Sequence, residues 1–310
     1  MTRIATIQLL WIPQAQFAGY LLAEHSDAGR KRGIAIRHRP MDFTIGPVEA
    51  VLTGQADFAV ASPSHILESG CPNELRFLLT IQQESPLVYP VRHDSGIETV
   101  RDLAGRRVAV WPGGEDLELR WTLLRSGVNP HTVERVPTKD TPNLFLSGEV
   151  DSAQVTQYHE LHQIEAGGVH RDQLRLLRAR DHAAALIKDG LITSRRLVVE
   201  EPEFVQAVVD TCIEGWSRAF DDGEAAVCAC LALGDGLDAI TQRRQLDEIR
   251  ELSLTGATHT HGLGYPDPKH VKHAARALAD TGHALPLSSW DHVLDQRFWE
   301  NAPAPGSMNL

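Results

Sequence analysis

The sequence predicts an α/β protein built from two units of similar character. The chain has 310 residues and is 42% hydrophobic, which suffices for about two domains. Over residues 4–81, short apolar segments alternate with helical patterns in a βαβαβ order. This order is typical of a largely parallel sheet with helices on its faces. A second alternating series follows over residues 87–167.

The first series contains four apolar runs that lie between turn residues. They predict strands at residues 4–10, 34–39, 58–61 and 75–81. Helices are predicted at residues 17–32, 47–54 and 63–69. Gly33 ends the first of these helices, and Pro47 begins the second because proline suits the first helical turn.

The second series repeats the pattern, and the remainder of the chain is mostly helical. Strands are predicted at residues 87–92, 107–111, 133–136 and 152–155. Helical segments are predicted at residues 95–103, 115–126, 143–147 and 158–165. Beyond them, residues 202–221 carry a broad apolar stripe that predicts a helix packed on the core. Further helices are predicted at residues 223–233, 237–252, 268–281 and 288–300, before a Pro/Gly/Ser-rich tail at 302–310.

Composition disfavours several classes of function. The formal net charge of −11 repels phosphate backbones and anionic lipid surfaces, so we expect no nucleic-acid partner. The sequence contains no stretch of about 18 apolar residues, so we expect no membrane insertion. Four scattered cysteines are too few for a disulfide scaffold. The histidine pairs at 259/261 and 270/273 have no carboxylate or cysteine nearby to complete a metal site. The sequence contains neither a phosphate loop nor a dinucleotide-binding fingerprint, so we expect no cofactor.

The start of the chain bears on localisation. Residues 1–13 hold one arginine and a short apolar run, without a small-residue cleavage site, and do not resemble a signal peptide. Residues 4–10 are also needed as the first strand. We therefore expect the chain as written to stay in the cytoplasm, or to be periplasmic or extracellular if a leader was removed.

Several segments, taken in order, resemble one known family. They are LWIP at 10–13, FAGY at 17–20, GQADF at 54–58, QESP at 83–86, DSGI at 94–97, DLAGRRV at 102–108, VWPGG at 110–114, GEVD at 148–151 and YHEL at 158–161. No single segment is specific for a family, but the order and spacing of the whole set are. The set resembles the family of bacterial binding proteins for pyrimidine thiamine precursors and alkanesulfonates, which also contains the fungal thiamine-pyrimidine synthase.

This resemblance implies a two-lobed periplasmic-binding-protein type 2 fold with a ligand cleft between the lobes. Lobe 1 would comprise residues 1–87 plus 190–310, and lobe 2 residues 88–189. Hinge closure is the motion that such a fold uses around a ligand. Open α/β sheets bind ligands at the carboxyl ends of their strands, so candidate site residues are sought there.

Five candidates fall in the first lobe. Trp11 follows the first strand and either stacks on a flat ligand or caps the sheet as a core residue. Gln16 either hydrogen-bonds the ligand or is an exposed residue at a helix start. Ser62 and His65 follow the third strand, and His65 is either a cleft residue or a structural hydrogen-bonding group. Glu84 either accepts from a ligand amine or is a surface carboxylate.

Further candidates fall in the second lobe. Trp111, Gly113 and Gly114 precede a predicted helix whose first turn would hold three acids, Glu115, Asp116 and Glu118. These acids would complement the helix dipole and repel a phosphate or sulfonate, so we expect a neutral or cationic ligand. Trp111, Gly113, Gly114 and Glu118 are candidate ligand contacts.

Two residues after the next strand complete the set. Tyr158 would pack on the ligand and Glu160 would accept a hydrogen bond, with a surface tyrosine and a helix-capping acid as the alternatives.

Two departures argue against the synthase activity. The family resemblance places the fungal pyridoxal-phosphate lysine at Ala61, where no Schiff base can form. The fungal cysteine-rich run corresponds to AAALI at residues 183–187.

We therefore expect a solute-binding protein of ABC-transporter type that binds a small, nitrogen-containing, heteroaromatic ligand related to thiamine pyrimidine precursors. Its partners would be this ligand and a transporter permease, with no catalytic residue, cofactor or metal. The alternative is a cytosolic enzyme on the same scaffold, in which His65 is the acid–base or substrate group and Glu84 or Glu160 the carboxylate.

Overall fold

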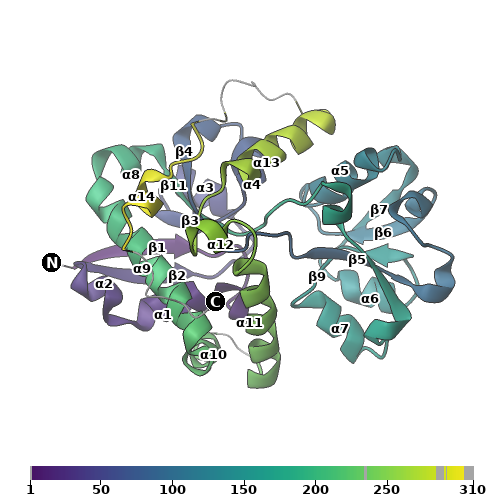
Figure 1. Cartoon of the computed structure of the whole chain (residues 1–310), viewed down its shortest axis with the longest axis horizontal. Helices are drawn as coiled ribbons and strands as arrows, with labels where there is room; N and C mark the ends of the chain where they lie inside the picture. The colour runs from purple at the N-terminus through teal and green to yellow at the C-terminus, as the bar shows by residue number, and fades with distance from the viewer. Residues whose placement is uncertain (1, 234–235, 284–289, 291, 304–310) are drawn as a thin grey trace. The chain divides into compact units, whose positions relative to one another are not determined.

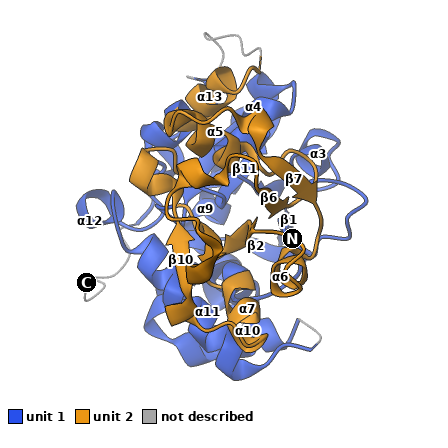
Figure 2. Cartoon of the chain, turned by 90° about the vertical axis from the view of Figure 1, so that its right-hand side faces the viewer, with its two compact units in different colours: residues 1–84, 187–272, 286–310 blue, residues 85–186, 273–285 orange. Residues whose placement is uncertain are grey.

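Figure 1 shows the computed structural model of the chain, which describes residues 2–233, 236–283, 290 and 292–303. The chain divides into two compact units (Figure 2). Unit 1 comprises Met1–Glu84, Ile187–Lys272 and Pro286–Leu310, and unit 2 comprises Ser85–Leu186 and His273–Leu285. Residues 273–283, which were expected in lobe 1, fall in unit 2 by this division.

Unit 1 is built on one sheet of five strands. Their order is β2 (Ile34–Arg39), β1 (Arg3–Gln8), β3 (Phe58–Val60), β11 (Gly190–Ser194) and β4 (Leu75–Thr80). β1 runs parallel to β2 and β3, as expected, whereas β11 runs antiparallel to β3 and β4. Because β11 is reversed, its first residue lies where the neighbouring strands end: Gly190 is paired with Thr80, and its carbonyl accepts from the N–H of Ala61 at 2.9 Å.

The first predicted helix of unit 1 is in fact two. α1 (Ala18–His25) and α2 (Asp27–Lys31) are separated by Ser26. Ser26 has an extended backbone, and its hydroxyl accepts from the N–H of Ala28. The prediction of one helix over residues 17–32 is wrong because a serine in this conformation caps a new helix.

Most of the other helices of unit 1 follow the predicted order more closely, but the helices at residues 195–200 and 258–261 were not predicted. These other helices are α3 (Pro47–Leu52), α4 (Pro63–Glu68), α8 (Arg195–Glu200), α9 (Pro202–Asp221), α10 (Gly223–Leu231), α11 (Ala239–Ser253), α12 (Thr258–His261) and α14 (Arg297–Glu300), with α13 (Pro268–Asp280) shared between the units. The predicted helix at 288–300 is wrong for residues 292–296. There, Leu294 forms a β-bridge with Phe77, and the N–H of Asp295 donates to the Phe77 carbonyl. Residues 288, 289 and 291 lie outside the described residues.

The core of unit 1 depends on the close packing of α1 against α9. The apolar stripe of α9 is buried as predicted, with Trp216 only 1% exposed. A Cβ at Gly19 would lie 2.2 Å from two ring carbons of Trp216, and one at Gly215 would lie 2.3 Å from the Gly19 carbonyl oxygen. Both positions require glycine because the two helix backbones approach too closely for a side chain.

Unit 2 contains two three-stranded sheets. In one, β6 (Arg107–Val110) lies parallel between β7 (Glu134–Pro137) and β8 (Ser152–Ala153). In the other, β5 (Leu87–Arg92) lies antiparallel between β10 (Leu174–Leu177) and β9 (Val155–Thr156). The strand predicted at 152–155 is therefore divided between two sheets. The helices of this unit include α5 (Leu117–Arg125), α6 (Thr141–Leu146) and α7 (Glu160–Ala166).

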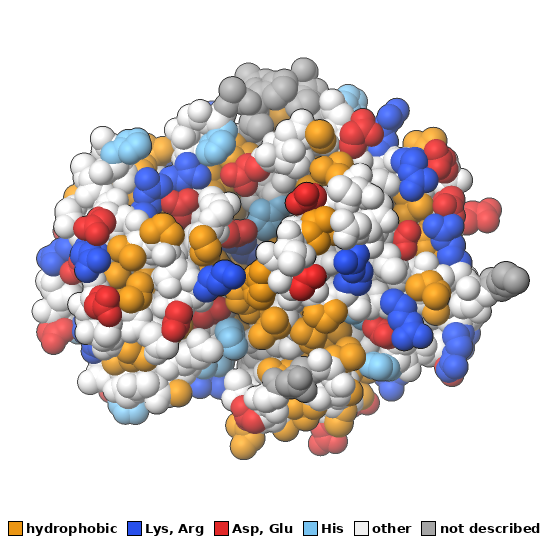
Figure 3. Space-filling view, turned by 180° about the vertical axis from the view of Figure 1, so that it is seen from behind, with side chains coloured by type: hydrophobic (Ala, Val, Ile, Leu, Met, Phe, Trp, Pro, Cys, Tyr) orange, Lys and Arg blue, Asp and Glu red, His pale blue; other side chains and the backbone are white. Residues whose placement is uncertain are grey.

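The surface mixes charges of both signs. Figure 3 shows Lys and Arg side chains interspersed with Asp and Glu side chains over one face of the molecule. Within the described part of the chain, no helix is both long enough and apolar enough to cross a membrane.

Candidate functional site

The carboxyl edge of the unit 1 sheet gathers polar side chains from four strands. Trp11 and Gln16 follow β1, while Ser62 and His65 follow β3. Gln82 follows β4, and Asp189 directly precedes the reversed strand β11. Since parallel strands end at one edge and β11 begins there, the topology alone places these residues on one side of the sheet.

A chain of buried amides converges on Asp189. Gln245 Nε2 donates to Gln14 Oε1 at 3.2 Å, and Gln14 Nε2 donates to Gln16 Oε1 at 3.0 Å. Gln16 Nε2 in turn donates to Asp189 Oδ1 and Oδ2 at 3.2 and 3.1 Å, and Gln82 Nε2 donates to Asp189 Oδ2 at 2.7 Å. Each bond fixes which end of the next amide is the donor. The network thereby holds both Gln16 and Gln82 in one orientation.

Gln16 is 8% exposed and Asp189 is 2% exposed, so the alternative of an exposed Gln16 at a helix start is wrong. Asp189 also acts on its surroundings. Burial raises the pKa of Tyr20 well above its usual value, with further contributions from Cys212 and Asp189. Tyr20 is therefore a neutral phenol that packs edge-on against Trp216, with ring centroids 5.5 Å apart.

The carboxyl end of β4 carries three buried polar atoms that have no partner in the structure, two amide oxygens and one hydroxyl. Because Gln82 Nε2 is committed to Asp189, its Oε1 is the remaining polar atom of that amide, and this oxygen is buried without a hydrogen bond. Gln83 Oε1 and Thr80 Oγ1 are also buried without a partner. A buried acceptor without a donor costs about 1–3 kcal/mol. These three atoms can be satisfied by N–H or O–H donors of a ligand or by water.

His65 lies on α4 in a reciprocal capping arrangement with Ser62. The Ser62 hydroxyl accepts from the N–H of His65 at 3.3 Å, and His65 Nδ1 accepts from the N–H of Ser62 at 3.2 Å. A nitrogen that accepts carries no proton, so in the neutral imidazole the proton is on Nε2. The Ser62 and Ser64 hydroxyls lie 2.8 Å apart. The structural alternative for His65, a hydrogen-bonding group in the helix cap, is thus present.

Trp11 forms an aromatic pair with Phe43, a residue that sequence reasoning missed. Their ring centroids are 5.0 Å apart and their planes lie at 82°. Trp11 is partly exposed, and so is Glu84 at the end of the first segment of unit 1. Trp11 is therefore not a buried core residue.

In unit 2, Trp111, Gly113 and Gly114 follow β6, and Tyr158 and Glu160 follow β9. Trp111 is partly exposed, and the two glycines are exposed with φ of +84° and +88°. Tyr158 is 1% exposed, so the alternative of a surface tyrosine is wrong. The Glu160 carboxylate accepts from the N–H of Thr156 at 2.9 Å. Their contact with a ligand stays a prediction.

The three acids ahead of α5 are not arranged as expected. The helix begins at Leu117, so only Glu118 lies in its first turn. Asp116 instead forms ion pairs with Arg135 at 2.7 Å and Arg120 at 3.3 Å. Glu118 is fully buried, and its carboxylate accepts from the N–H of Leu186 at 2.6 Å. These two carboxylates are engaged in holding unit 2 together.

Gln82 and Asp189, which sequence reasoning also missed, carry a recognisable signal. Gln82 and Gln83 directly follow the apolar run at 75–81. Lys188 and Asp189 are two consecutive charged residues between the apolar residues 183–187 and 190–192, and both are buried. Charged residues inside an apolar run are rarely buried without a specific role.

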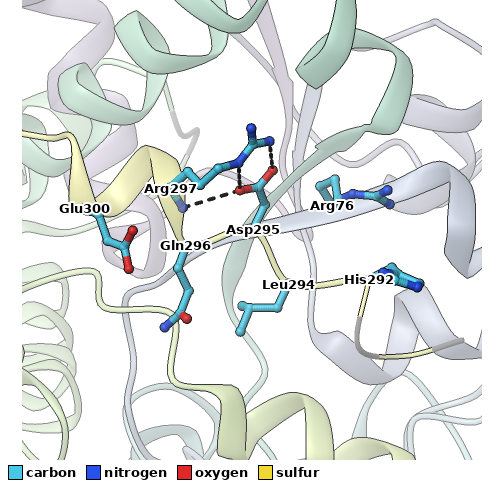
Figure 4. A pocket seen from close by; sticks show the side chains of 7 residues that line it. All are labelled: Arg76, His292, Leu294, Asp295, Gln296, Arg297 and Glu300. Carbon is cyan, nitrogen blue, oxygen red and sulfur yellow. Dashed lines mark hydrogen bonds and ion pairs between the residues drawn. The ribbon is translucent and has the colours of Figure 1, made fainter. Parts of the chain in front are cut away.

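A separate surface hollow of about 420 Å³ lies at the opposite, amino end of β4 (Figure 4). Its central ion pair joins the Arg297 guanidinium to Asp295, at 2.8 and 2.6 Å. Arg76 Nη1 donates to the carbonyls of Asn73 and Leu75. Arg76, Asp295 and Arg297 are thus engaged with other groups of the protein. Among the described residues, no group of His, Cys, Asp or Glu side chains could hold a metal ion.

The fold is shared with several solved structures. The chain has the periplasmic-binding-protein fold, as similar solved structures show. The ligand-binding component of an ABC-type import system from Staphylococcus aureus, solved with zinc bound, has a TM-score of 0.71 at 10% identity, over 97% of this chain and 99% of that chain. The putative sulfonate-binding protein SsuA from Methylobacillus flagellatus has a TM-score of 0.70 at 17% identity, over 96% and 93%. The desulfurization enzyme DSZB has a TM-score of 0.63 at 18% identity, over 96% and 98%.

The family follows from the sequence itself. Residues 14–226 match the NMT1/THI5-like family, and the chain belongs to this family. The resemblance inferred from the motifs is thereby confirmed. No curated protein matches the chain in sequence. At the identities of the solved structures, their likeness shows the fold alone, and the ligand remains to be argued from the site.

Proposed function

We propose that the chain is a solute-binding protein of an ABC import system, and that its ligand is a small nitrogen heteroaromatic compound related to thiamine pyrimidine precursors. The observation that carries the proposal is the buried Gln82 Oε1, which has no partner and is held by the bond from Gln82 Nε2 to Asp189. Ring amines and protonated ring nitrogens supply the N–H donors that such acceptors lack.

The ligand is proposed to be neutral or cationic. The edge of the unit 1 sheet offers two amide oxygens, Gln82 Oε1 and Gln83 Oε1, which can only accept. A phosphate or sulfonate needs donors instead, as an arginine fork provides. Two arginines that could have supplied such a fork are engaged: Arg120 pairs with Asp116, and the Arg92 guanidinium lies over the Phe145 ring.

A binding experiment tests the ligand class. A 4-amino-5-(aminomethyl)pyrimidine, its 5-hydroxymethyl analogue and the phosphate ester of that analogue are titrated calorimetrically. The amino and hydroxymethyl forms should bind more tightly than the ester. At 100 times its Kd, a ligand raises the free energy of unfolding by about 2.7 kcal/mol, so a thermal-shift assay gives an independent check. Tightest binding by the ester would contradict the proposed charge.

Two substitutions test the site. Gln82→Met removes the acceptor at similar volume and should raise the Kd about fivefold to tenfold, since a hydrogen bond contributes about 1 kcal/mol or somewhat more. Trp11→Ala should also weaken binding. Gln55→Met, at an exposed turn, is the matched control and should leave the Kd unchanged. If neither site variant differs from the wild type, the ligand does not bind at this edge of the sheet.

An enzyme on the same scaffold has less support. His65 Nδ1 already accepts from the N–H of Ser62, so it cannot also act as the base. The expected outcome of incubating the pyrimidines with the protein is complex formation without turnover. A chemical change that depends on His65 would favour the enzyme instead.

A further inference from the structure

Phe43 has a backbone conformation that is costly for its residue type. Its φ is +64°, in the left-handed region, which bulky side chains seldom adopt. Among the described residues, Ala183 is the other non-glycine residue with positive φ. The Phe43 side chain is nevertheless 45% exposed, so burial of its ring does not compensate for the strain. Strain of this kind persists where the surrounding structure imposes it, and it concentrates at ligand contacts.

The chain on both sides of Phe43 imposes this conformation. The Asp42 carboxylate accepts from the N–H of Thr44 at 2.9 Å and from its hydroxyl at 2.7 Å. The N–H of Met41 donates to the Trp11 carbonyl at 3.3 Å. Gln8 Nε2 donates to the carbonyls of Arg39 and Pro40, at 3.0 and 3.3 Å. The loop after β2 is thus tied to the segment after β1, and Phe43 is held against Trp11.

The two rings form a right-angled corner at the carboxyl edge of the sheet. Trp11 follows β1, and Phe43 follows its parallel neighbour β2. With planes at 82°, a flat ring that stacks on one aromatic face presents its edge to the other, which is the geometry that aromatic quadrupoles favour. The corner lies at the same sheet edge as Ser62, Gln82 and Asp189.

We propose that Phe43 is a ligand-contacting residue that, together with Trp11, selects a planar aromatic ring. This inference rests on the proposed function and adds to it: the ligand has a flat ring on the β1–β2 side of the site and hydrogen-bond donors on the β4 side. The positive φ of Phe43 is required to place its ring at that corner.

The test compares Phe43→Ala with Phe43→Gly, using the 4-amino-5-(aminomethyl)pyrimidine as the probe. Both variants remove the ring, so each should raise the Kd about fivefold. At most positions a glycine variant is less stable than an alanine variant, and here we expect the reverse. Phe43→Gly should have the higher Tm, because glycine adopts positive φ without strain. Phe43→Tyr keeps the ring and should keep the affinity.

The matched control is Ala183→Gly, which relieves the same kind of strain in unit 2 and should change the Tm without changing the Kd. If Trp11→Ala and Gln82→Met weaken binding while Phe43→Ala does not, Phe43 is no ligand contact and the proposed function stands. If all three variants retain wild-type affinity, the ligand does not bind at this edge of the sheet, and the site assignment fails together with this inference. If the wild-type protein binds none of the pyrimidines, the proposed function itself fails. A lower Tm for Phe43→Gly than for Phe43→Ala would overturn the strain argument.

Discussion

Replacing Gln82 by Glu tests the buried network most directly, because it exchanges one donor for a second carboxylate. Gln82 Nε2 lies 2.7 Å from Asp189 Oδ2, and both residues are almost fully buried. In Gln82→Glu, two carboxylates at this distance cannot both be ionised, so the pair shares one proton. The folded state of the variant therefore binds a proton that the unfolded state releases above its ordinary pKa of about 4.3.

The sign and size of the effect follow from this difference in bound protons. Below about pH 4, the glutamic acid is protonated in both states, donates to Asp189, and replaces the lost amide bond. Above about pH 4.3, the folded variant binds more protons than the unfolded chain, so its stability falls relative to wild type as pH rises. The slope is about 1.4 kcal/mol per pH unit. Two pH units higher, the deficit is about 3 kcal/mol, and it stops growing at the raised pKa of the pair.

Urea denaturation of both proteins between pH 4.5 and 7 measures this difference in the free energy of unfolding. Gln55→Glu introduces the same charge at an exposed turn and should show a nearly flat difference over that range. A Gln82→Glu deficit that does not change with pH would refute the hydrogen bond to Asp189, and with it the orientation of the Gln82 amide.

Two further predictions concern stability. Gly19→Ala should destabilise unit 1 by about 3 kcal/mol or more, because its Cβ would lie 2.2 Å from the Trp216 ring and 2.6 Å from its Cα. Gly46→Ala, with open space around the new Cβ and a negative φ, should be close to neutral in the same melting experiment. Burial lowers the pKa of His38, although the hydrogen bond to the Glu24 carboxylate opposes this shift. Below about pH 6.5 the unfolded chain therefore takes up a proton at His38, whereas the folded protein keeps this imidazole neutral. Stability should consequently fall as pH drops from 6.5 toward the folded pKa, and His38→Gln should reduce that dependence in chemical denaturation.

The sequence predicts the elements whose signals are local. The stripe of α9 needs only a helical period, and its bounds Pro202–Asp221 match the prediction. Local signals also compete, as at Ser26, where a serine inside a helical pattern begins a new helix. The segment at 292–296 shows the limit of such reasoning. Its pairing with Phe77 joins residues more than 200 positions apart, and nothing within either segment predicts it.

The candidate site divides in the same way. Trp11, Ser62 and His65 could be predicted because each directly follows a strand that runs in the expected direction. Asp189 could not, because it precedes β11, and only the antiparallel pairing of that strand brings its first residue to the carboxyl edge. Gln82 follows a predicted strand, but its importance lies in the bond to Asp189. The role of such a residue can be predicted only when the position of its hydrogen-bond partner is known.

The expected charge of the ligand depends on different residues in the structure than in the sequence. From the sequence, the acids near α5 favour a neutral or cationic ligand over a strongly anionic one. In the structure, Asp116 is paired with Arg135 and Arg120, and Glu118 is buried and accepts from the N–H of Leu186, so the two carboxylates do not form the acidic first turn on which that expectation rested. The acceptor atoms on β4 now carry the same expectation, for a different reason. An anion bound there would leave Gln82 Oε1 unsatisfied, whereas an amine donates to it, so the preference belongs to unit 1 and should disappear in Gln82→Met while surviving substitution of Glu118.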